Sequence, residues 1–225
     1  MPNEAVIKQE ADAYFSRNRN QMENTECAIG INIFEKFYEK IRTDFEINRV
    51  LEIGCSGGYN LIYLNKKYQL ECYGIEPSQQ AVDYGSEKVR QLGLNNVFLK
   101  QGFSHYLPYD DNSFDVVYLG FCAYQVDRKY LFKTFEETDR VLKCGGFCVI
   151  TDFDTPIPYI RENIHNKEVY TYKNDYIHYL LPYGYTLVDK TMYSHASMGF
   201  TADVQERLST QILYKEKKED LYVMG

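Results

Sequence analysis

The feature that most constrains the fold is a short apolar run that ends in a glycine-rich turn, VLEIGCSGGYN, at residues 50–60. The run at 49–55 has the length of a buried strand, and the apolar spacing in 58–68 predicts a helix directly after it. Glycines in such a turn let the backbone approach a ligand closely and present amides at a helix N-terminus. The stretch therefore predicts a strand-turn-helix unit that binds a ligand.

The same alternation of strand and helix patterns continues along the chain to residue 154. Further strands are expected at 70–76, 96–101, 113–120, 146–154, 185–194 and 207–216, and helices at 29–42, 77–93 and 128–143. Strands that alternate with helices predict a mostly parallel sheet with right-handed crossovers and helices on both faces. We therefore expect one α/β domain at 29–225. It is interrupted by an irregular segment at 155–183 and preceded by a polar segment at 1–28.

Composition and charge exclude several classes of function. The 225 residues contain 25 Lys and Arg against 32 Asp and Glu, a net charge of −7, which argues against a nucleic-acid partner. The six cysteines form neither a C-x-x-C pair nor a zinc-ligand spacing, so we expect reduced thiols and no metal site. No secretion signal and no run approaching ~18 apolar residues is present, which favours a cytoplasmic protein without a membrane segment.

Two ligand-binding patterns compete for the first glycine turn. A dinucleotide fingerprint that starts at Gly54 requires glycine at positions 56 and 59, where this chain has Ser56 and Tyr59. The second pattern is an acid followed by alternating glycines, and here the chain supplies Glu52, Gly54 and Gly58 with Ser56 in the middle place. This stretch resembles motif I of the class I S-adenosylmethionine (SAM)-dependent methyltransferases, with Ser56 as a departure.

Three later stretches extend this resemblance over roughly residues 48–154. Glu76 ends the second expected strand, 22 residues after Gly54, where an acid can accept hydrogen bonds from ribose hydroxyls. The stretch at 100–120 is similar to the family's Gly-Asp-Ala-x-x-Leu-Pro-Phe-x-Asp-x-Ser-Phe-Asp-Val-Val, and 139–154 to its Arg-Val-Leu-Lys-Pro-Gly-Gly-x-Leu. The resemblance implies a Rossmann-like seven-stranded sheet whose last strand is antiparallel. It also implies SAM as cofactor and S-adenosylhomocysteine as product.

The resemblance also implies which residues bind the cofactor. They are Glu52, Gly54, Ser56, Gly58, Glu76, Phe103, Ser104 and Arg17. Phe103 stands where the family often has an Asp that contacts the adenine amino group, so adenine binding is expected to use stacking and the backbone of Phe103 and Ser104. Similar N-terminal segments fold over the cofactor, so we expect 1–28 to form a lid with Arg17 near the methionine carboxylate.

The acceptor is expected beyond the fifth strand, because ligands of open α/β sheets bind at the carboxyl ends of the strands. We predict that 155–183 caps an acceptor pocket and that Asp154 and His165 are candidate bases for a hydroxyl acceptor. An anionic acceptor would instead need Lys173 or Arg161. The sequence is similar to methyltransferases found with bacterial surface-polysaccharide genes. That similarity implies O-methylation of a sugar, a nucleotide-sugar or a phosphoryl oxygen, and it leaves the oligomeric state open.

Two other functions remain as alternatives. A nucleotide-dependent oxidoreductase is disfavoured by the failed spacing at Ser56 and Tyr59. A SAM-binding or scaffold protein without catalysis stays open, because Ser56 and Phe103 depart from the family pattern. Among methyltransferases, a nucleic-acid enzyme is disfavoured, since LGFCAYQ after the fourth strand lacks the Asn/Asp-Pro-Pro-Tyr/Phe segment of amino-methylating enzymes.

Overall fold

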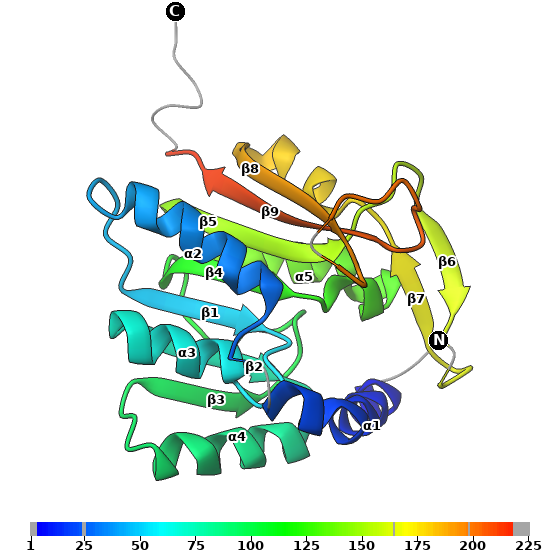
Figure 1. Cartoon of the computed structure of the whole chain (residues 1–225), viewed down its shortest axis with the longest axis horizontal. Helices are drawn as coiled ribbons and strands as arrows, with labels where there is room; N and C mark the ends of the chain where they lie inside the picture. Colours follow the sequence, from blue (N-terminus) through cyan, green and yellow to red (C-terminus); the bar gives the residue numbers. More distant parts are fainter. Residues whose placement is uncertain (1–3, 24–25, 164, 198, 218–225) are drawn as a thin grey trace, which may run out of the picture.

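A seven-stranded sheet in the order β3-β2-β1-β4-β5-β9-β8 forms the centre of the protein. A computed structural model describes residues 4–23, 26–163, 165–197 and 199–217. The strands of the sheet are β1 (Arg49–Ile53), β2 (Glu71–Glu76), β3 (Val97–Gln101), β4 (Phe114–Gly120), β5 (Leu142–Phe153), β8 (Tyr185–Ser194) and β9 (Arg207–Lys215). Each expected strand is present (Figure 1).

The strand directions confirm the predicted fold class. Strands β1 to β5 pair in parallel, whereas β9 is antiparallel to both of its neighbours, β5 and β8. The chain reaches β9 from β8 through a reversal rather than through a crossover helix, which is why the last strand changes direction. The sheet is thus the mostly parallel, seven-stranded sheet that the resemblance implies.

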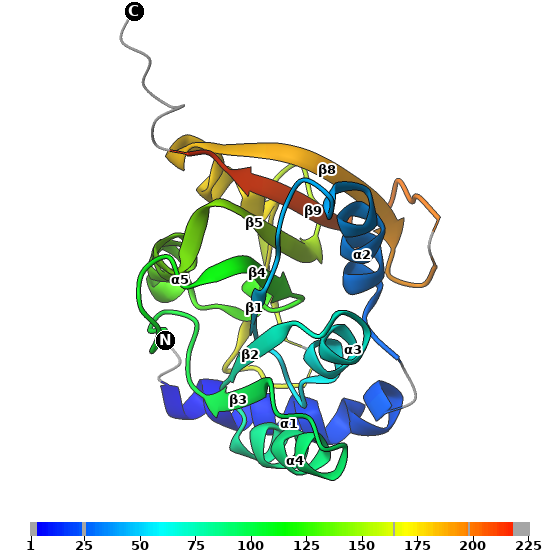
Figure 2. The same cartoon turned by 90° about the vertical axis from the view of Figure 1, so that its left-hand side faces the viewer.

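Helices cover both faces of the sheet. They are α2 (Ile29–Ile41), α3 (Tyr59–Tyr68), α4 (Gln79–Gln91) and α5 (Arg128–Val141), whereas α1 (Glu4–Glu23) lies near the carboxyl ends of the strands. Figure 2 shows α5 on one side of the sheet and α2 and α3 on the other. Successive β5 residues alternate between these layers: Cys148 and Ile150 belong to the core under α5, and Phe147 and Val149 to the core under α2 and α3. Within the described residues, no helix combines the length and the apolar character needed to cross a bilayer.

The long helix α1 was not expected from the sequence. Its hydropathy is low and weakly periodic, because the residues that face the sheet are a mixture of apolar and polar side chains. Ile7, Ala11, Tyr14 and Asn18 recur at helical spacing and line one cavity. On another side of the helix, Phe15 packs on Tyr84 of α4 with ring centroids 5.6 Å apart.

The junction between α5 and β5 also differs from the expectation. The sequence predicts a helix to residue 143 and a strand from residue 146, but the helix ends at Val141 and β5 begins at Leu142. Leu142 is fully buried and pairs with Phe114, so burial of this apolar residue starts the strand early. The glycines instead form an irregularity in β5, where the register shifts and Gly145 has φ +84°.

The irregular segment 155–183 contains a second, two-stranded sheet. Strands β6 (Tyr159–Glu162) and β7 (Tyr170–Lys173) form an antiparallel hairpin, followed by two short 3-10 helices, η2 (Tyr176–Tyr179) and η3 (Leu181–Tyr183). In Figure 1 the hairpin stands beyond the ends of the central strands, on the same side of the molecule as α1. Two elements outside the sheet therefore lie at its carboxyl edge.

All six cysteines are free thiols in the fold. Cys27, Cys55, Cys72 and Cys148 are buried, and burial raises the pKa of Cys72 to about 12. Their burial in the core agrees with the expectation that they are reduced side chains of structural character.

Candidate functional site

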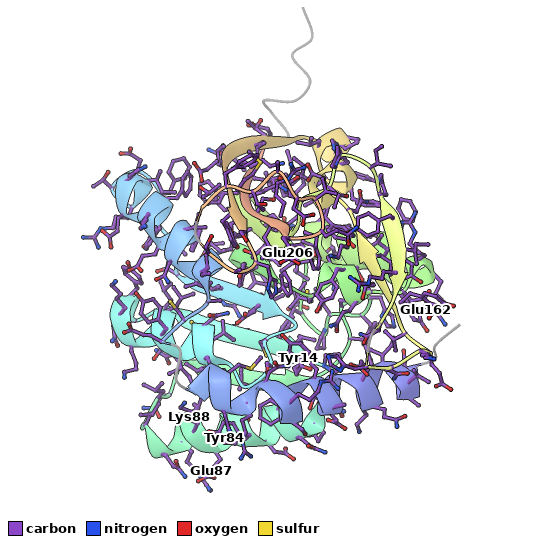
Figure 3. The ribbon with its side chains drawn as sticks, turned by 45° about the vertical axis from the view of Figure 1, so that its right-hand side comes forward. Tyr14, Tyr84, Glu87, Lys88, Glu162 and Glu206 are labelled. Atoms are coloured by element: carbon purple, nitrogen blue, oxygen red, sulfur yellow. The ribbon has the colours of Figure 1, made fainter. Side chains whose placement is uncertain are left out.

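A cavity of about 890 Å³ lies at the carboxyl ends of the parallel strands. The ends of β1, β2 and β4 and the residues after β3 form its floor, while α1 and the β6–β7 hairpin form its other walls. Figure 3 shows Tyr14 on the side of α1 that faces the strand ends. This crevice is where open α/β sheets bind ligands, and its volume is at the upper end of the ~300–1,000 Å³ of typical ligand pockets.

The turn after β1 has the backbone conformation that its glycines predict. Gly54 has φ +77°, and a Cβ on it would lie 2.7 Å from Cβ of Cys122. Gly58 has φ +70° and precedes the first residue of α3. Ser56 has φ +48°, so it adopts the left-handed conformation of the glycine it replaces. The departure at Ser56 therefore leaves the shape of the turn intact.

The carboxylate of Glu76 joins the end of β2 to this turn. Its Oε2 accepts a hydrogen bond from the amide of Ser56 at 2.8 Å, and its Oε1 accepts one from the amide of Ser78 at 2.9 Å. Burial raises the pKa of Glu76 to about 6 although both hydrogen bonds act to lower it. Each oxygen retains a lone pair, so the carboxylate can also accept hydrogen bonds from ligand hydroxyls in the cavity.

Glu52, at the end of β1, lies beneath the same cavity. Its Oε1 accepts a hydrogen bond from Nδ2 of Asn60 at 2.7 Å, and Oδ1 of Asn60 accepts one from the amide of Ala28 at 2.8 Å. The other oxygen, Oε2, is buried without a hydrogen-bond partner. Burial, with a smaller contribution from the charge of Glu76, raises the pKa of Glu52 to about 8. A cationic group in the cavity would satisfy this oxygen, which fits the ammonium group of the methionine part of SAM.

The residues after β3 present stacked rings to the cavity. The ring of Phe103 lies 5.6 Å from that of His105, which stacks on Tyr130 of α5 at 3.9 Å. Ser104 is fixed by a 2.8 Å hydrogen bond between its Oγ and Oγ1 of Thr134. Phe103 and Ser104 thus line the cavity, and their contact with the cofactor stays a prediction. His105 and Tyr130 also line the cavity and were not among the predicted site residues. Their stacking joins residues 25 positions apart, and no local sequence signal predicts it.

Arg17 lies in the cavity wall formed by α1. Its Nη2 is 2.8 Å from Oε1 of Glu10, one of the buried acids, and both residues line the cavity. The guanidinium is therefore held by an acid of its own helix. Its predicted contact with a methionine carboxylate stays a prediction.

Three aromatic residues form the wall on the other side of the turn. Phe121 lies 4.9 Å from Tyr124 and 5.3 Å from Phe153 between ring centroids. Phe121 has φ +56°, a strained conformation for a non-glycine residue that is often found at functional sites. Asp152 supports this wall, since its carboxylate accepts hydrogen bonds from the amides of Tyr124 at 3.1 Å and Phe153 at 2.8 Å.

The structure separates the two candidate bases. His165, in the β6–β7 connection, lines the cavity, but Asp154 does not. Asp154 is buried, with Oδ2 3.2 Å from Nζ of Lys190 on β8, and Lys190 lies equally close to Asp175. Side chains alternate along β5, so Phe153 faces the cavity and its neighbour Asp154 is directed elsewhere. The prediction that Asp154 contacts the acceptor is therefore corrected. Across the described ranges, no three His, Cys, Asp or Glu side chains are grouped so that they could hold a metal ion.

A solved structure resembles the fold of this protein over nearly the whole chain. The crystal structure of the [4+2]-cyclase SpnF superposes with a TM-score of 0.71 at 17% sequence identity, covering 96% of this chain and 97% of that one. Residues 50–146 match the family model described as the methyltransferase domain. Over these residues the chain is similar to methyltransferase domains. The cofactor of this class of domain is SAM, and the partnerless oxygen of Glu52 and the carboxylate of Glu76 fit it.

Curated relatives are similar to the chain over part of their length. The uncharacterized methyltransferase YcgJ of Bacillus subtilis is 30% identical over 109 residues, 48% of this chain and 42% of that protein. Phosphoethanolamine N-methyltransferase 1 of Arabidopsis thaliana is 27% identical over 194 residues, 84% of this chain and 36% of that protein. The match thus spans less than half the length of these relatives.

Proposed function

We propose that the protein transfers a methyl group from SAM to a small-molecule acceptor bound in the same cavity. The observation that carries this proposal is the division of the cavity into two parts. One part, around the turn after β1, contains the buried carboxyl groups of Glu52 and Glu76. The other part, between the strand ends and the hairpin, is lined mainly by aromatic rings. Its buried acid, Asp127, caps α5, since its Oδ1 accepts a hydrogen bond from the amide of Lys129 at 2.9 Å.

Each part suits one of the two substrates. When bound, SAM supplies an electrophilic methyl group on a sulfonium. Glu52 would hold the ammonium group of its methionine part, and Glu76 would hold the ribose hydroxyls. The aromatic wall and the hairpin would position the acceptor and exclude water, which is the main contribution of the protein to an in-line displacement.

The acceptor atom is the finer part of the proposal. We expect an oxygen acceptor, supported by His165, which lines the cavity and could accept the proton of a hydroxyl group. The Arabidopsis relative is named for N-methylation, so the family permits other acceptor atoms. A sugar, a nucleotide-sugar or a phosphoryl acceptor fits a cavity of this size. A role in surface-polysaccharide synthesis rests on the sequence resemblance alone.

Two measurements test the proposal. Titration calorimetry is expected to show binding of SAM and of S-adenosylhomocysteine, and no detectable binding at millimolar cofactor would overturn it. Transfer of labelled methyl from SAM to pooled small molecules, fractionated by charge, is expected to label at least one fraction. Cofactor binding with no transfer to any pool would favour the alternative of a cofactor-binding protein with another activity. One structural neighbour is named as a [4+2]-cyclase, so the same fold occurs in a protein named for another activity.

A further inference from the structure

A buried cation in the acceptor part of the cavity is not matched by an acid. Within the described part of the chain, Lys173 is the only buried lysine or arginine, with 5% of its surface exposed, and it lines the cavity. Its Nζ donates a hydrogen bond to the carbonyl oxygen of Gln205 at 2.8 Å and lies 3.7 Å from the ring centroid of Phe153. Both of these partners are uncharged.

Other partly buried lysines of this protein differ from Lys173. Nζ of Lys190 lies 3.2 Å from carboxylate oxygens of both Asp154 and Asp175, and Nζ of Lys215 lies 3.0 Å from Oδ1 of Asp139. No described carboxylate lies within 4 Å of Nζ of Lys173. Burying a charge without a counter-charge costs free energy, so an uncompensated lysine in a cavity wall indicates a ligand that completes the pair.

Arg161 adds a second positive charge on the same face of the hairpin. Tyr159 pairs with Lys173 and Arg161 with Thr171, so Arg161 and Lys173 are diagonal neighbours on one face. Arg161 also lines the cavity, and the structure places no described acid within ion-pair distance of it. Burial and the nearby charge of Arg161 both lower the pKa of Lys173. The two cations therefore repel each other in the ligand-free protein.

The described acids in this region form no ion pair with Lys173 or Arg161. Asp203, Glu206 and Asp152 act on Lys173 only from beyond 4 Å, and both carboxylate oxygens of Asp152 accept backbone hydrogen bonds. Glu162 also lines the cavity, but it is exposed and follows Arg161 directly in β6, so it lies on the opposite face of the hairpin from Arg161 and Lys173. Among the described residues, neither Lys173 nor Arg161 therefore has an acid as an ion-pair partner.

We propose that Lys173 and Arg161 bind an anionic oxygen group, a carboxylate or a phosphoryl group, carried by the methyl acceptor. This inference rests on the proposed function, because it places the acceptor in the part of the cavity that faces the hairpin. Arg161 can bind such a group through two parallel N–H donors, and the remaining protons of Lys173 are free to donate to it. The rings of Phe121 and Phe153 beside this site favour an acceptor with a planar or apolar body.

The test uses the full chain saturated with S-adenosylhomocysteine and three probes of similar shape. Benzoate and phenyl phosphate carry the anionic group, and benzamide is the neutral match. Titration calorimetry is expected to show that at least one anionic probe binds at least about tenfold more tightly than benzamide. The tighter of the two anions identifies the group as a carboxylate or a phosphoryl group.

Variants assign the preference to this pair of residues. Lys173→Met and Arg161→Met are each expected to reduce the preference for the anionic probe by about fivefold or more, while cofactor affinity changes less than twofold. Lys173→Arg is expected to retain most of the preference. Lys167→Met is the matched control, because Lys167 is exposed on the same hairpin and does not line the cavity. Since Arg161 is exposed, its variant remains informative if Lys173→Met does not fold.

Three outcomes would overturn the inference. They are benzamide binding as tightly as both anions, no binding of either anion at 10 mM, and an unchanged preference in both methionine variants. The last outcome would point to a different role for Lys173, such as a base. Failure of the proposed function has a different signature, because the protein would then not bind S-adenosylhomocysteine in the first step.

Discussion

Oε2 of Glu76 lies 2.8 Å from the backbone nitrogen of Ser56 and accepts its hydrogen bond, which joins the end of β2 to the turn after β1. The contact holds the amide of a residue with φ +48° and keeps the carboxylate at the edge of the cavity. One side chain thus stabilises the left-handed turn and remains available to a ligand. This double role makes Glu76 the residue through which the cofactor site can be tested most directly.

Replacing Glu76 is expected to weaken cofactor binding. In Glu76→Ala the ribose hydroxyls lose their acceptor, so the affinity for S-adenosylhomocysteine should fall by ~1–3 kcal/mol. Glu76→Gln keeps the size of the side chain but removes one of two acceptor oxygens, so a smaller loss is expected. Titration calorimetry measures both. Glu87→Ala on the exposed side of α4, labelled in Figure 3, is the control and should bind normally. An unchanged affinity in Glu76→Ala would remove this residue from the cofactor site.

Cofactor binding is expected to release a proton from Glu52. With a pKa of about 8, this carboxyl is mostly protonated at pH 7, and an ammonium group beside it favours the ionised form. Binding should therefore release up to roughly one proton. Calorimetric titrations at pH 7 in phosphate and in Tris measure the number, because the observed heat varies with the ionisation enthalpy of the buffer.

The variant Glu52→Gln tests whether the proton released on cofactor binding comes from Glu52 or from another group. The variant should bind S-adenosylhomocysteine with no proton release, and equal release in the variant and the parent would contradict the assignment.

The raised pKa of Glu52 also predicts how the stability of the ligand-free protein depends on pH. The folded state holds the proton more tightly than the unfolded state, so stability is lost as the pH rises from about 4.5 to about 8. In urea unfolding, this loss should be smaller in Glu52→Gln.

The fold was predictable because its elements carry strong local signals. Val50, Leu51 and Ile53 are buried on both faces of the sheet, so β1 reads as a continuous apolar run. The β6–β7 hairpin carries no such signal. Apolar residues such as Ile160 and Tyr170 are exposed, so the sequence shows no alternation between a buried apolar face and an exposed polar face. Helix α1 was missed for a related reason, because its cavity-facing residues suit a ligand rather than a core.

The positions of candidate site residues could be predicted from the sequence where the end of a strand determines them, and could not be predicted for the other residues. Glu76 is the last residue of β2 and Glu52 the last but one of β1, and both line the cavity. Asp154 also follows a strand, but alternation along β5 and the attraction of Lys190 direct it elsewhere. The pairing of Lys173 with a carbonyl and a ring depends on the register of the hairpin, which the sequence does not specify.

The β6–β7 hairpin is expected to serve the acceptor rather than the cofactor. Replacing residues 159–173 with a Gly/Ser linker removes one cavity wall but leaves Glu52, Glu76 and α1 in place. The affinity for S-adenosylhomocysteine should remain within a few-fold, whereas methyl transfer should fall by at least about 10²-fold because the acceptor is no longer positioned. Calorimetry and a labelled-methyl assay measure the two effects. A folded variant that no longer binds the cofactor would show that the hairpin belongs to the cofactor site.

Asp154 and His165 are expected to affect different properties of the protein. Asp154→Asn leaves Lys190 with Asp175 as its remaining carboxylate partner, so the free energy of unfolding should fall by about 1–3 kcal/mol. Turnover per folded molecule should change less than about twofold, because Asp154 does not reach the cavity. His165→Asn should do the reverse, with turnover reduced by ~10²-fold or more for a hydroxyl acceptor and little change in stability, since this side chain is exposed.

Urea unfolding and initial-rate measurements on the same preparations distinguish these effects. The comparison depends on the ratio of the two losses, so incomplete folding of one variant does not obscure it. Lost turnover in Asp154→Asn at unchanged stability would mean that the carboxylate reaches the acceptor after all, and that Lys190 releases it when ligands bind. Full turnover in His165→Asn would remove His165 as a base. The anion-binding pair of Lys173 and Arg161 would then be the stronger account of how the acceptor is prepared, because an ionised oxygen has no proton to lose.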